Sequence, residues 1–239
     1  MEIKSLLTKL IDETEDAPIE NVFIGLYSIY VKGVRVGLSS TMHQFVKHLP
    51  VEDLENLEAK STKELAQYIF SNRILEATLG MAAINSSIKM DEKYFVEKNA
   101  FDIIHDKSIG KKVAVFGDFP FVKKLKPISE ELFLFEKKEG SEYLREDDMP
   151  SILPKADLVV ISGTTIFNHT FIDILKNCSD SSFKIILGPS TPLTTVLFDY
   201  GIDVISGVMV SDEDKVFKYI SRAAPFKYIK GKTFICMIK

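Results

Sequence analysis

Five short apolar runs, all beyond residue 110, constrain the fold of this chain more than any other feature of its sequence. Each run is apolar without alternation and ends at a glycine or a polar residue. In chain order, the runs with their endings read KKVAVFGDF, ELFLFE, ADLVVISGTT, FKIILGPST and IDVISG. Continuous apolar runs of this kind are typical of strands that are buried on both faces of a parallel sheet. The sequence therefore predicts five strands of a mostly parallel sheet.

Amphipathic patterns lie between some of these runs. Segments 167–178 and 193–200 repeat apolar residues at the spacing of one helix face. Strands that alternate with helices indicate a Rossmann-like α/β domain, which we place at residues 101–239.

The first hundred residues follow a different pattern. Apolar residues at helical spacing predict a helix within residues 1–16. Two β-rich runs, 22–31 and 34–38, predict a β-hairpin around Lys32-Gly33. Segment 71–88, SNRILEATLGMAAINSSI, is apolar on nearly every side, so we expect a buried helix there. These elements predict an α+β domain at residues 1–100.

Composition excludes several classes of protein. The net charge is −4, with acids and bases interspersed, so we expect no nucleic-acid partner. Two distant cysteines, Cys178 and Cys236, indicate neither a disulfide framework nor a zinc finger. No signal-peptide pattern is visible, and no apolar run approaches the roughly 20 residues that span a bilayer. We therefore expect a cytoplasmic protein without a membrane partner.

Candidate binding residues follow the predicted strands. Ligands of open parallel sheets bind outside the carboxyl ends of the strands, so these endings are the places to search. Five segments lie at such ends: 117–120, Glu136, 162–165, 188–191 and 206–207.

The fourth ending, Gly188-Pro189-Ser190-Thr191, has two interpretations. Thr191 can cap a helix that begins with Pro192 and stops at Gly201. A cap needs only one hydroxyl, however, and two hydroxyls beside free helix N–H groups also make a site for an anion or a carbonyl group. The sequence leaves both interpretations open.

The third ending, SGTTIFNHT at residues 162–170, is similarly polar. Thr165 or Asn168 can cap the helix that follows, which accounts for one polar residue of several. We therefore also expect Gly163, Thr164, Thr165 and Asn168 to face a ligand. His169 is better explained as an exposed structural residue than as a catalytic one.

The first ending, GDFP, lacks the glycines of a dinucleotide-binding fingerprint. Asp118 follows Gly117 directly, and its carboxylate would repel a pyrophosphate, which argues against NAD or FAD. Glu136 lies at the end of the next strand, where acids that bind a ribose are found. A solvated charge at a strand end is the equally simple explanation of Glu136.

Metal ligands at useful spacing are absent from the sequence. The four histidines form no His-x-x-x-His pair, and His43 and His48 are five residues apart, which is wrong for one helical face. A hard divalent cation held by Asp118 and Glu136 stays open as an alternative.

The motifs SNRILEATLGMAAINSSI, SGTTIFNHT and LGPSTPLTTVLFDYGIDVISGV together resemble a family described as heavy-metal chelation proteins. The resemblance covers nearly the whole chain. It implies an enolase N-terminal-like domain joined to a Rossmann-like domain, an interdomain pocket, and metal handling or corrinoid-related metabolism. It also implies that Asn72 and Glu76, at the start of the buried helix, face that pocket. The alternative for Glu76 is a capping role or a pair with Arg73.

Three hypotheses of function result. The first is a protein that binds a small molecule, a divalent metal ion or a metal complex in an interdomain cleft at the strand ends. In it, Ser190 and Thr191 donate hydroxyls, residues 163–168 form the opposite wall, and Asp118 and Glu136 accept hydrogen bonds or coordinate a cation. The second is an enzyme that transfers a group from an adenosyl cofactor. The third is a non-catalytic homodimeric scaffold.

Overall fold

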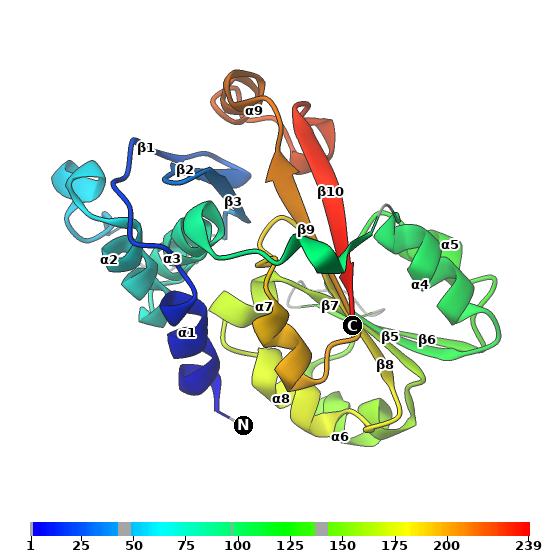
Figure 1. Ribbon diagram of the computed structural model, residues 1–239. Coiled ribbons are helices and arrows are strands. Elements are labelled where there is room, and N and C mark those ends of the chain that lie inside the picture. The colour runs from blue at the N-terminus through cyan, green and yellow to red at the C-terminus, as the bar shows by residue number, and fades with distance from the viewer. Residues whose placement is uncertain (1, 43–48, 97, 137–142) are drawn as a thin grey trace.

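The computed structural model describes residues 2–42, 49–96, 98–136 and 143–239. Two sheets organise these residues, and Figure 1 shows the first part of the chain, in blue and cyan, beside the larger sheet. The smaller sheet is antiparallel, and the larger sheet has seven strands, most of them parallel. The predicted mixed α/β fold is thereby confirmed.

The larger sheet contains the five predicted strands in the order β6-β5-β7-β8-β9, all parallel. This order is that of doubly wound sheets, in which the chain runs from the first strand to one side and then returns to the other. Two antiparallel strands, β10 and β4, extend the sheet beyond β9. The bounds are β4 Phe95–Val96, β5 Lys112–Phe116, β6 Glu131–Phe135, β7 Leu158–Ser162, β8 Phe183–Leu187, β9 Val204–Val210 and β10 Lys232–Ile238.

Both faces of the larger sheet are covered, as the unbroken apolar runs require. Val113 and Val115 pack under α4 and α5, whereas Ala114 and Phe116 join the core beneath α7 and α8. The helices that follow the first half are α4 Ala100–Ser108, α5 Val122–Leu125, α6 Met149–Ile152, α7 Thr164–Phe167, α8 Phe171–Asn177 and α9 Glu213–Ile220.

The described residues of the first half form three α-helices, short 3-10 helices and the smaller sheet. The long helix α3 is buried, as predicted, and it packs against β3, α2 and the short 3-10 helix η2, Gln67–Phe70. A Cβ on Gly80 of α3 would lie 2.8 Å from the carbonyl carbon of Tyr68. The backbone of η2 can therefore pack closely against α3 at Gly80, because this residue has no side chain. The bounds are α1 Ile3–Asp12, β1 Asn21–Ile24, β2 Ser28–Lys32, β3 Val36–Ser40, α2 Thr62–Ala66 and α3 Ile74–Ser87.

The structure corrects the predicted hairpin. The expected strand 22–31 is two strands, because the chain turns at residues 25–27 and β1 then pairs with β2. The predicted turn at Lys32-Gly33 joins β2 to β3. The smaller sheet is therefore a three-stranded meander.

Two further expectations about the second half are wrong. Ser206 and Gly207 do not end a strand, because β9 continues to Val210 and pairs with β10 at Cys236 and Ile235. The expected helix capped by Thr191 is a 3-10 helix, η6 Thr195–Tyr200, whose cap is Thr194. The predicted stop at Gly201 is confirmed.

Candidate functional site

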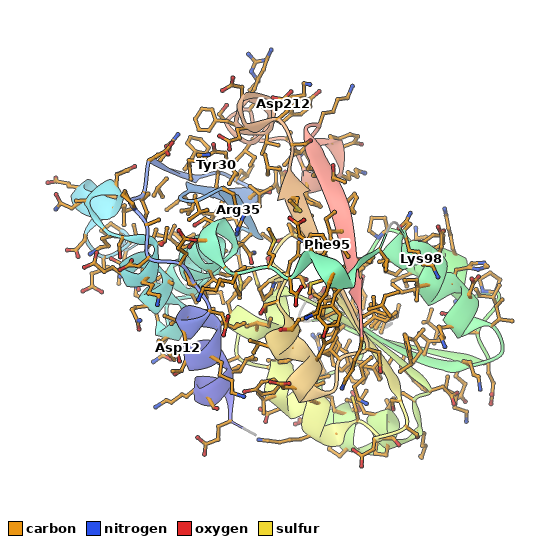
Figure 2. The ribbon with its side chains drawn as sticks, in the orientation of Figure 1. Asp12, Tyr30, Arg35, Phe95, Lys98 and Asp212 are labelled. Carbon is orange, nitrogen blue, oxygen red and sulfur yellow. The ribbon has the colours of Figure 1, made fainter. Side chains whose placement is uncertain are left out.

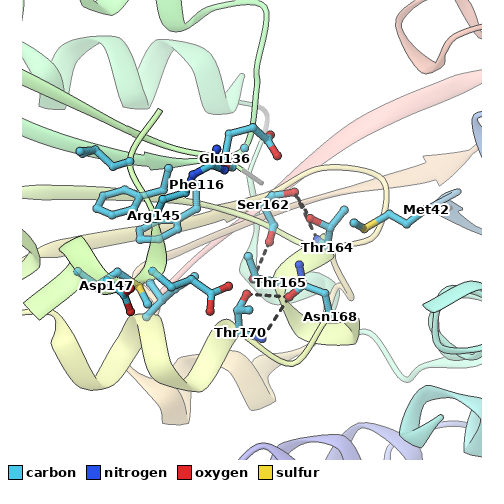
Figure 3. A pocket seen from close by; sticks show the side chains of 16 residues that line it. Met42, Phe116, Glu136, Arg145, Asp147, Ser162, Thr164, Thr165, Asn168 and Thr170 are labelled. Carbon is cyan, nitrogen blue, oxygen red and sulfur yellow. Dashed lines mark hydrogen bonds between the residues drawn. The ribbon is translucent and has the colours of Figure 1, made fainter. Parts of the chain in front are cut away.

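A cavity of about 510 Å³ lies at the carboxyl ends of β5, β6 and β7 (Figure 3). The chain leaves β5 towards β6 on one side and returns across β5 to reach β7, so this position is the topological switch point of the sheet. The cavity is lined by Met42, Phe116, Gly117, Phe135, Glu136, Leu144, Arg145, Glu146, Asp147, Met149, Ser162, Thr164, Thr165, Asn168, Thr170 and Ile174. Among the lining residues that the structure describes, Met42 alone comes from the first half of the chain.

One wall of the cavity is a network of hydroxyl groups around Ser162 (Figure 3). The Thr164 hydroxyl donates to Ser162 Oγ at 2.9 Å, and the Thr165 hydroxyl donates to the Ser162 carbonyl at 2.7 Å. Since Ser162 is the last residue of β7, the strand fixes the position of all three side chains. The network leaves this wall rigid and polar.

Asn168 and Thr170 extend this wall between α7 and α8. Asn168 Oδ1 accepts from the Thr170 hydroxyl at 2.7 Å and from the Thr170 backbone N–H at 3.1 Å. Because the carbonyl oxygen of the carboxamide is engaged in this way, its NH2 group remains to donate hydrogen bonds to a bound molecule.

The opposite wall is charged. Glu136 follows β6, and its Oε2 accepts from the Asp118 backbone N–H at 3.0 Å, which joins the loops after β5 and β6. The Arg145 guanidinium donates to the Glu136 carbonyl at 2.9 Å. Together with Glu146 and Asp147, this wall carries three carboxylates and one guanidinium.

Apolar side chains form the rest of the lining. The rings of Phe116 and Phe135, the last residues of β5 and β6, stack with centroids 4.5 Å apart. Met149 and Ile174 add aliphatic surface from α6 and α8. The cavity therefore offers a flat apolar surface between one hydroxyl wall and one charged wall.

The structure brings four of the twelve sequence-predicted site residues into this lining: Glu136, Thr164, Thr165 and Asn168. Asp118 is exposed beside it and contributes its backbone N–H to Glu136. Gly163 lies at the start of α7 but packs against Thr191, where a Cβ would be 2.7 Å from the Thr191 nitrogen.

The loop Gly188-Pro189-Ser190-Thr191 does not line the cavity. Instead it packs against the first half, where Ser190 Oγ accepts from the Ser40 N–H at 2.9 Å and the Pro189 carbonyl accepts from Asn85 Nδ2 at 3.3 Å. Ser190 and Thr191 are both buried. The two predicted walls therefore do not face each other, because β3 and α3 cover the end of β8.

Asn72 and Glu76 also lie outside the cavity lining. Asn72 is exposed, whereas Glu76 is buried and ion-paired with Arg73. The Glu76 carboxylate also accepts from the Ser71 hydroxyl at 2.6 Å and the Glu52 N–H at 2.9 Å. This geometry agrees with the alternative interpretation, in which Glu76 pairs with Arg73.

Several lining residues were missed by the sequence reasoning. Arg145, Glu146 and Asp147 precede the short helix α6, in a segment without strand or helix periodicity, and Met42 follows β3. The run of charges directly before Met149-Pro150 is the one signal that marks a helix start there.

A heavy-metal ion needs several cysteine, histidine or carboxylate ligands that converge on one point. The described residues contain no group of three or more His, Cys, Asp or Glu side chains that could hold a metal ion. His43 and His48 lie outside the described residues. The described donors therefore do not fit a heavy-metal ion that is coordinated by protein side chains alone.

The fold and the cavity together define a two-sheet α/β protein with a ligand-sized pocket at the switch point of its larger sheet. The DUF364 family model, described as "Putative heavy-metal chelation", matches residues 99–237, and the DUF4213 model, with the same description, matches residues 7–88. The chain belongs to this family.

Similar proteins share both halves of the chain. An uncharacterized protein of Methanocaldococcus jannaschii is 31% identical over 185 residues, which cover 72% of this chain and 69% of that protein. A DUF364-family crystal structure from Desulfitobacterium hafniense has a TM-score of 0.86 and 23% identity, and covers 99% of both chains. Another, from Pyrococcus horikoshii, has a TM-score of 0.81 and 21% identity, and covers 100% of both chains. Both are described as proteins of unknown function, and at these identities they show the fold alone.

Within the described ranges, no helix is long and apolar enough to cross a bilayer. The domain boundary near residue 100, the enolase-like character of the first half and the cytoplasmic location stay predictions.

Proposed function

We propose that the cavity at the ends of β5, β6 and β7 binds a small organic molecule or a metal complex that carries positive charge. The observation that supports this most is the composition of the lining, with three carboxylates and one guanidinium opposite hydroxyl and carboxamide groups. Among the described lining residues, carboxylates outnumber the single guanidinium, which favours a cationic ligand, and the polar wall fixes its orientation.

The apolar surface supports an organic ligand over a bare ion. Phe116, Phe135, Met149 and Ile174 gain nothing from a hydrated cation, whereas they stabilise a ring or a hydrocarbon by burying it. A metal bound here would arrive with its own organic ligand, as the family description and a corrinoid-related role both allow.

A ligand screen by thermal unfolding tests the proposal. The panel contains divalent metal salts, tetrapyrroles, pterins and adenosyl compounds. A ligand at one hundred times its Kd stabilises the folded protein by about 2.7 kcal/mol, which raises the Tm by roughly 5–10 °C for a chain of this size. A flat response across the panel would contradict the proposal.

Variants of the lining make the screen specific. Glu136→Gln removes the charge but keeps an oxygen for the Asp118 N–H, and Thr164→Val removes a hydroxyl from the wall. We expect each to weaken binding by about ten-fold, since each removes one polar contact. Glu58→Gln and Thr233→Val, at exposed positions far from the cavity lining, are the matched controls.

A second candidate is an enzyme that transfers a group from an adenosyl cofactor. Its support is the position of Glu136, whose carboxylate follows the second strand and holds the loop after the first strand through the Asp118 N–H. An acid at this place binds ribose hydroxyls in other doubly wound sheets. Titration with S-adenosylmethionine tests it, and an affinity unchanged in Glu136→Ala would remove the proposed contact.

A non-catalytic homodimeric scaffold is the third hypothesis. In this hypothesis the buried helix and the hairpin would serve a dimer interface, but β3, α2 and η2 of the same chain pack on helix α3. Light scattering measures the oligomeric state, and a dimer that responds to no ligand of the panel would favour the scaffold.

A further inference from the structure

The last 25 residues carry a strong charge imbalance. Residues 215–239 contain seven lysines and arginines and not one aspartate or glutamate, although the whole chain has a net charge of −4. The acids and bases are therefore interspersed only in the rest of the chain. A surface region whose charges are mostly of one sign attracts ligands of the opposite charge.

The fold gathers four of these seven cations around one groove. The groove has a volume of about 800 Å³ and is lined by Asp212, Asp214, Lys215, Lys218, Tyr219, Arg222, Ala224 and Lys230. It lies at the projecting tip of β9 and β10, beside α9, where Figure 2 marks Asp212. None of its lining residues lines the cavity at the switch point.

The helical repeat of α9 places several of the lining side chains on one face of the helix. Val216 and Ile220 are buried against the first half, so the other face of the helix is turned outward. Lys215, Lys218 and Tyr219 share this outward face, and Arg222 continues it in the turn that ends the helix. Like charges three and four residues apart repel one another, which costs stability unless an anion lies between them.

Lys230 reaches the same groove from the other side. Gly231 packs against the start of α9, where a Cβ would lie 2.8 Å from the Asp212 carbonyl oxygen. The Gly231 carbonyl accepts from the backbone N–H groups of Ser211 and Asp212 at 2.8 and 3.1 Å. This close approach fixes the backbone next to Lys230, which lines the groove together with Lys218 and Arg222.

Three of the four cations are not neutralised within the described part of the chain. Lys215 pairs with Asp212 at 2.6 Å, which uses the charges of both. Lys218, Arg222 and Lys230 form no ion pair with any described residue, and all three are exposed. The groove therefore presents three cations without an ion-pair partner among the described residues, together with the Asp214 carboxylate and one tyrosine, so positive charge is in excess.

We propose that this groove binds a small molecule that carries two or more linked phosphates. A guanidinium binds phosphate through two parallel hydrogen bonds, and lysine ammonium groups add point charges at flexible distances. A diphosphate carries more negative charge and more acceptor oxygens than a single carboxylate, so it can engage more than one of these cations at once. Tyr219 supplies a hydroxyl and a ring for the remainder of the molecule. The groove is separate from the cavity of the proposed function and does not depend on it.

The test uses the full chain and sodium pyrophosphate in isothermal titration calorimetry at low salt. We expect binding that weakens as salt is added, because the contacts are between charges. The variant Lys218→Gln/Arg222→Gln/Lys230→Gln should weaken it by at least about ten-fold, since three charge-assisted contacts are lost. Arg222→Lys keeps the charge but not the paired hydrogen bonds, and should lose part of the affinity.

A matched control separates the groove from general electrostatics. Lys123→Gln/Lys126→Gln/Lys155→Gln removes three exposed positive charges from other parts of the surface, and should bind pyrophosphate as the unmodified protein does. An equal loss in this control, or no binding by the unmodified protein, overturns the proposal. Tighter binding to a single-stranded oligonucleotide or to vesicles of anionic lipid, lost in the groove variant, overturns it too, because the ligand is then a macromolecule or a membrane.

Discussion

The imidazole Nε2 of His169 lies 3.1 Å from the backbone carbonyl oxygen of Ile69, one hundred residues earlier in the chain. His169 has a positive φ of 65°, and its neighbours Asn168 and Thr170 both line the cavity. Non-glycine residues seldom adopt this backbone conformation, so surrounding contacts must hold it. The bond between His169 and Ile69 therefore connects a wall of the cavity to the first half of the chain.

Replacing His169 should reveal this connection. His169→Asn keeps a residue that tolerates a positive φ but cannot reach Ile69, so we expect a loss of about 1 kcal/mol in the free energy of unfolding. His169→Ala should lose about 2 kcal/mol, because the backbone conformation adds its own cost. Urea unfolding measures both. An Asn variant as stable as the unmodified protein would show that the bond contributes nothing.

Removing Glu76 should destabilise the first half. Its buried carboxylate accepts from Ser71 and Glu52, and Arg73 is its partly exposed ion-pair partner. We expect Glu76→Ala to lower the free energy of unfolding by about 2–4 kcal/mol, mainly through the hydrogen bonds to a charged group. Glu76→Gln keeps the shape and should cost less. The exposed control Glu58→Gln should change stability by less than about 0.5 kcal/mol.

Gly80→Ala distinguishes close packing from helix propensity. Propensity alone predicts a gain of about 1 kcal/mol for alanine inside a helix. The added Cβ would lie 2.8 Å from the Tyr68 carbonyl carbon, and backbone atoms cannot move aside as a side chain can. Overpacking of this kind costs about 1–3 kcal/mol, so we expect net destabilisation in denaturant unfolding. A more stable variant would mean that η2 shifts at little cost.

The thiol of Cys178 should react slowly in the folded protein. Burial raises the pKa of Cys178 to about 11, from an ordinary value near 9. At pH 8 the thiolate fraction is then about one hundredth of that in the unfolded chain, and only the thiolate reacts. Alkylation with and without urea measures the ratio, and Cys178→Ser identifies the contribution of Cys236.

The same pKa shift gives stability a pH dependence. Between pH 9 and 11 the unfolded chain releases the Cys178 proton while the folded chain keeps it. The contribution of Cys178 to the free energy of unfolding is therefore fully present below pH 9, and it is lost as the pH rises through this window. In Cys178→Ser this part of the decline should disappear, and an unchanged profile would contradict the assignment.

The sequence predicted the parallel strands well, for a physical reason. Burial on both faces removes polar residues from a strand, so runs such as 113–116 and 158–161 stand out without any tertiary information. The strands β10 and β4 were missed because β10, with Lys232, Thr233 and Phe234 exposed or half-buried, lacks such a run. Pairing with β9 rather than composition makes it a strand.

The candidate site was predictable only where it depends on one sheet. Glu136, Thr164, Thr165 and Asn168 line the cavity because strand ends of one parallel sheet converge at one edge. The same argument failed for Ser190, since docking of β3 on the loop after β8 is a tertiary event with no local signal. Met42 was missed for the same reason, whereas Arg145 was missed because it lies in a segment without strand or helix periodicity.

The bond from the Ser40 N–H to Ser190 Oγ shows that the chain occupies part of its own open sheet edge. Of the two hydroxyl-rich turns, 162–165 after β7 and 188–191 after β8, the first half of the molecule covers the second. At this edge of the sheet, the space left for a bound molecule among the described residues is the cavity at the ends of β5, β6 and β7, which Met42 lines from the first half. Replacing Met42 with alanine would remove that side chain from the lining, and larger ligands should then bind.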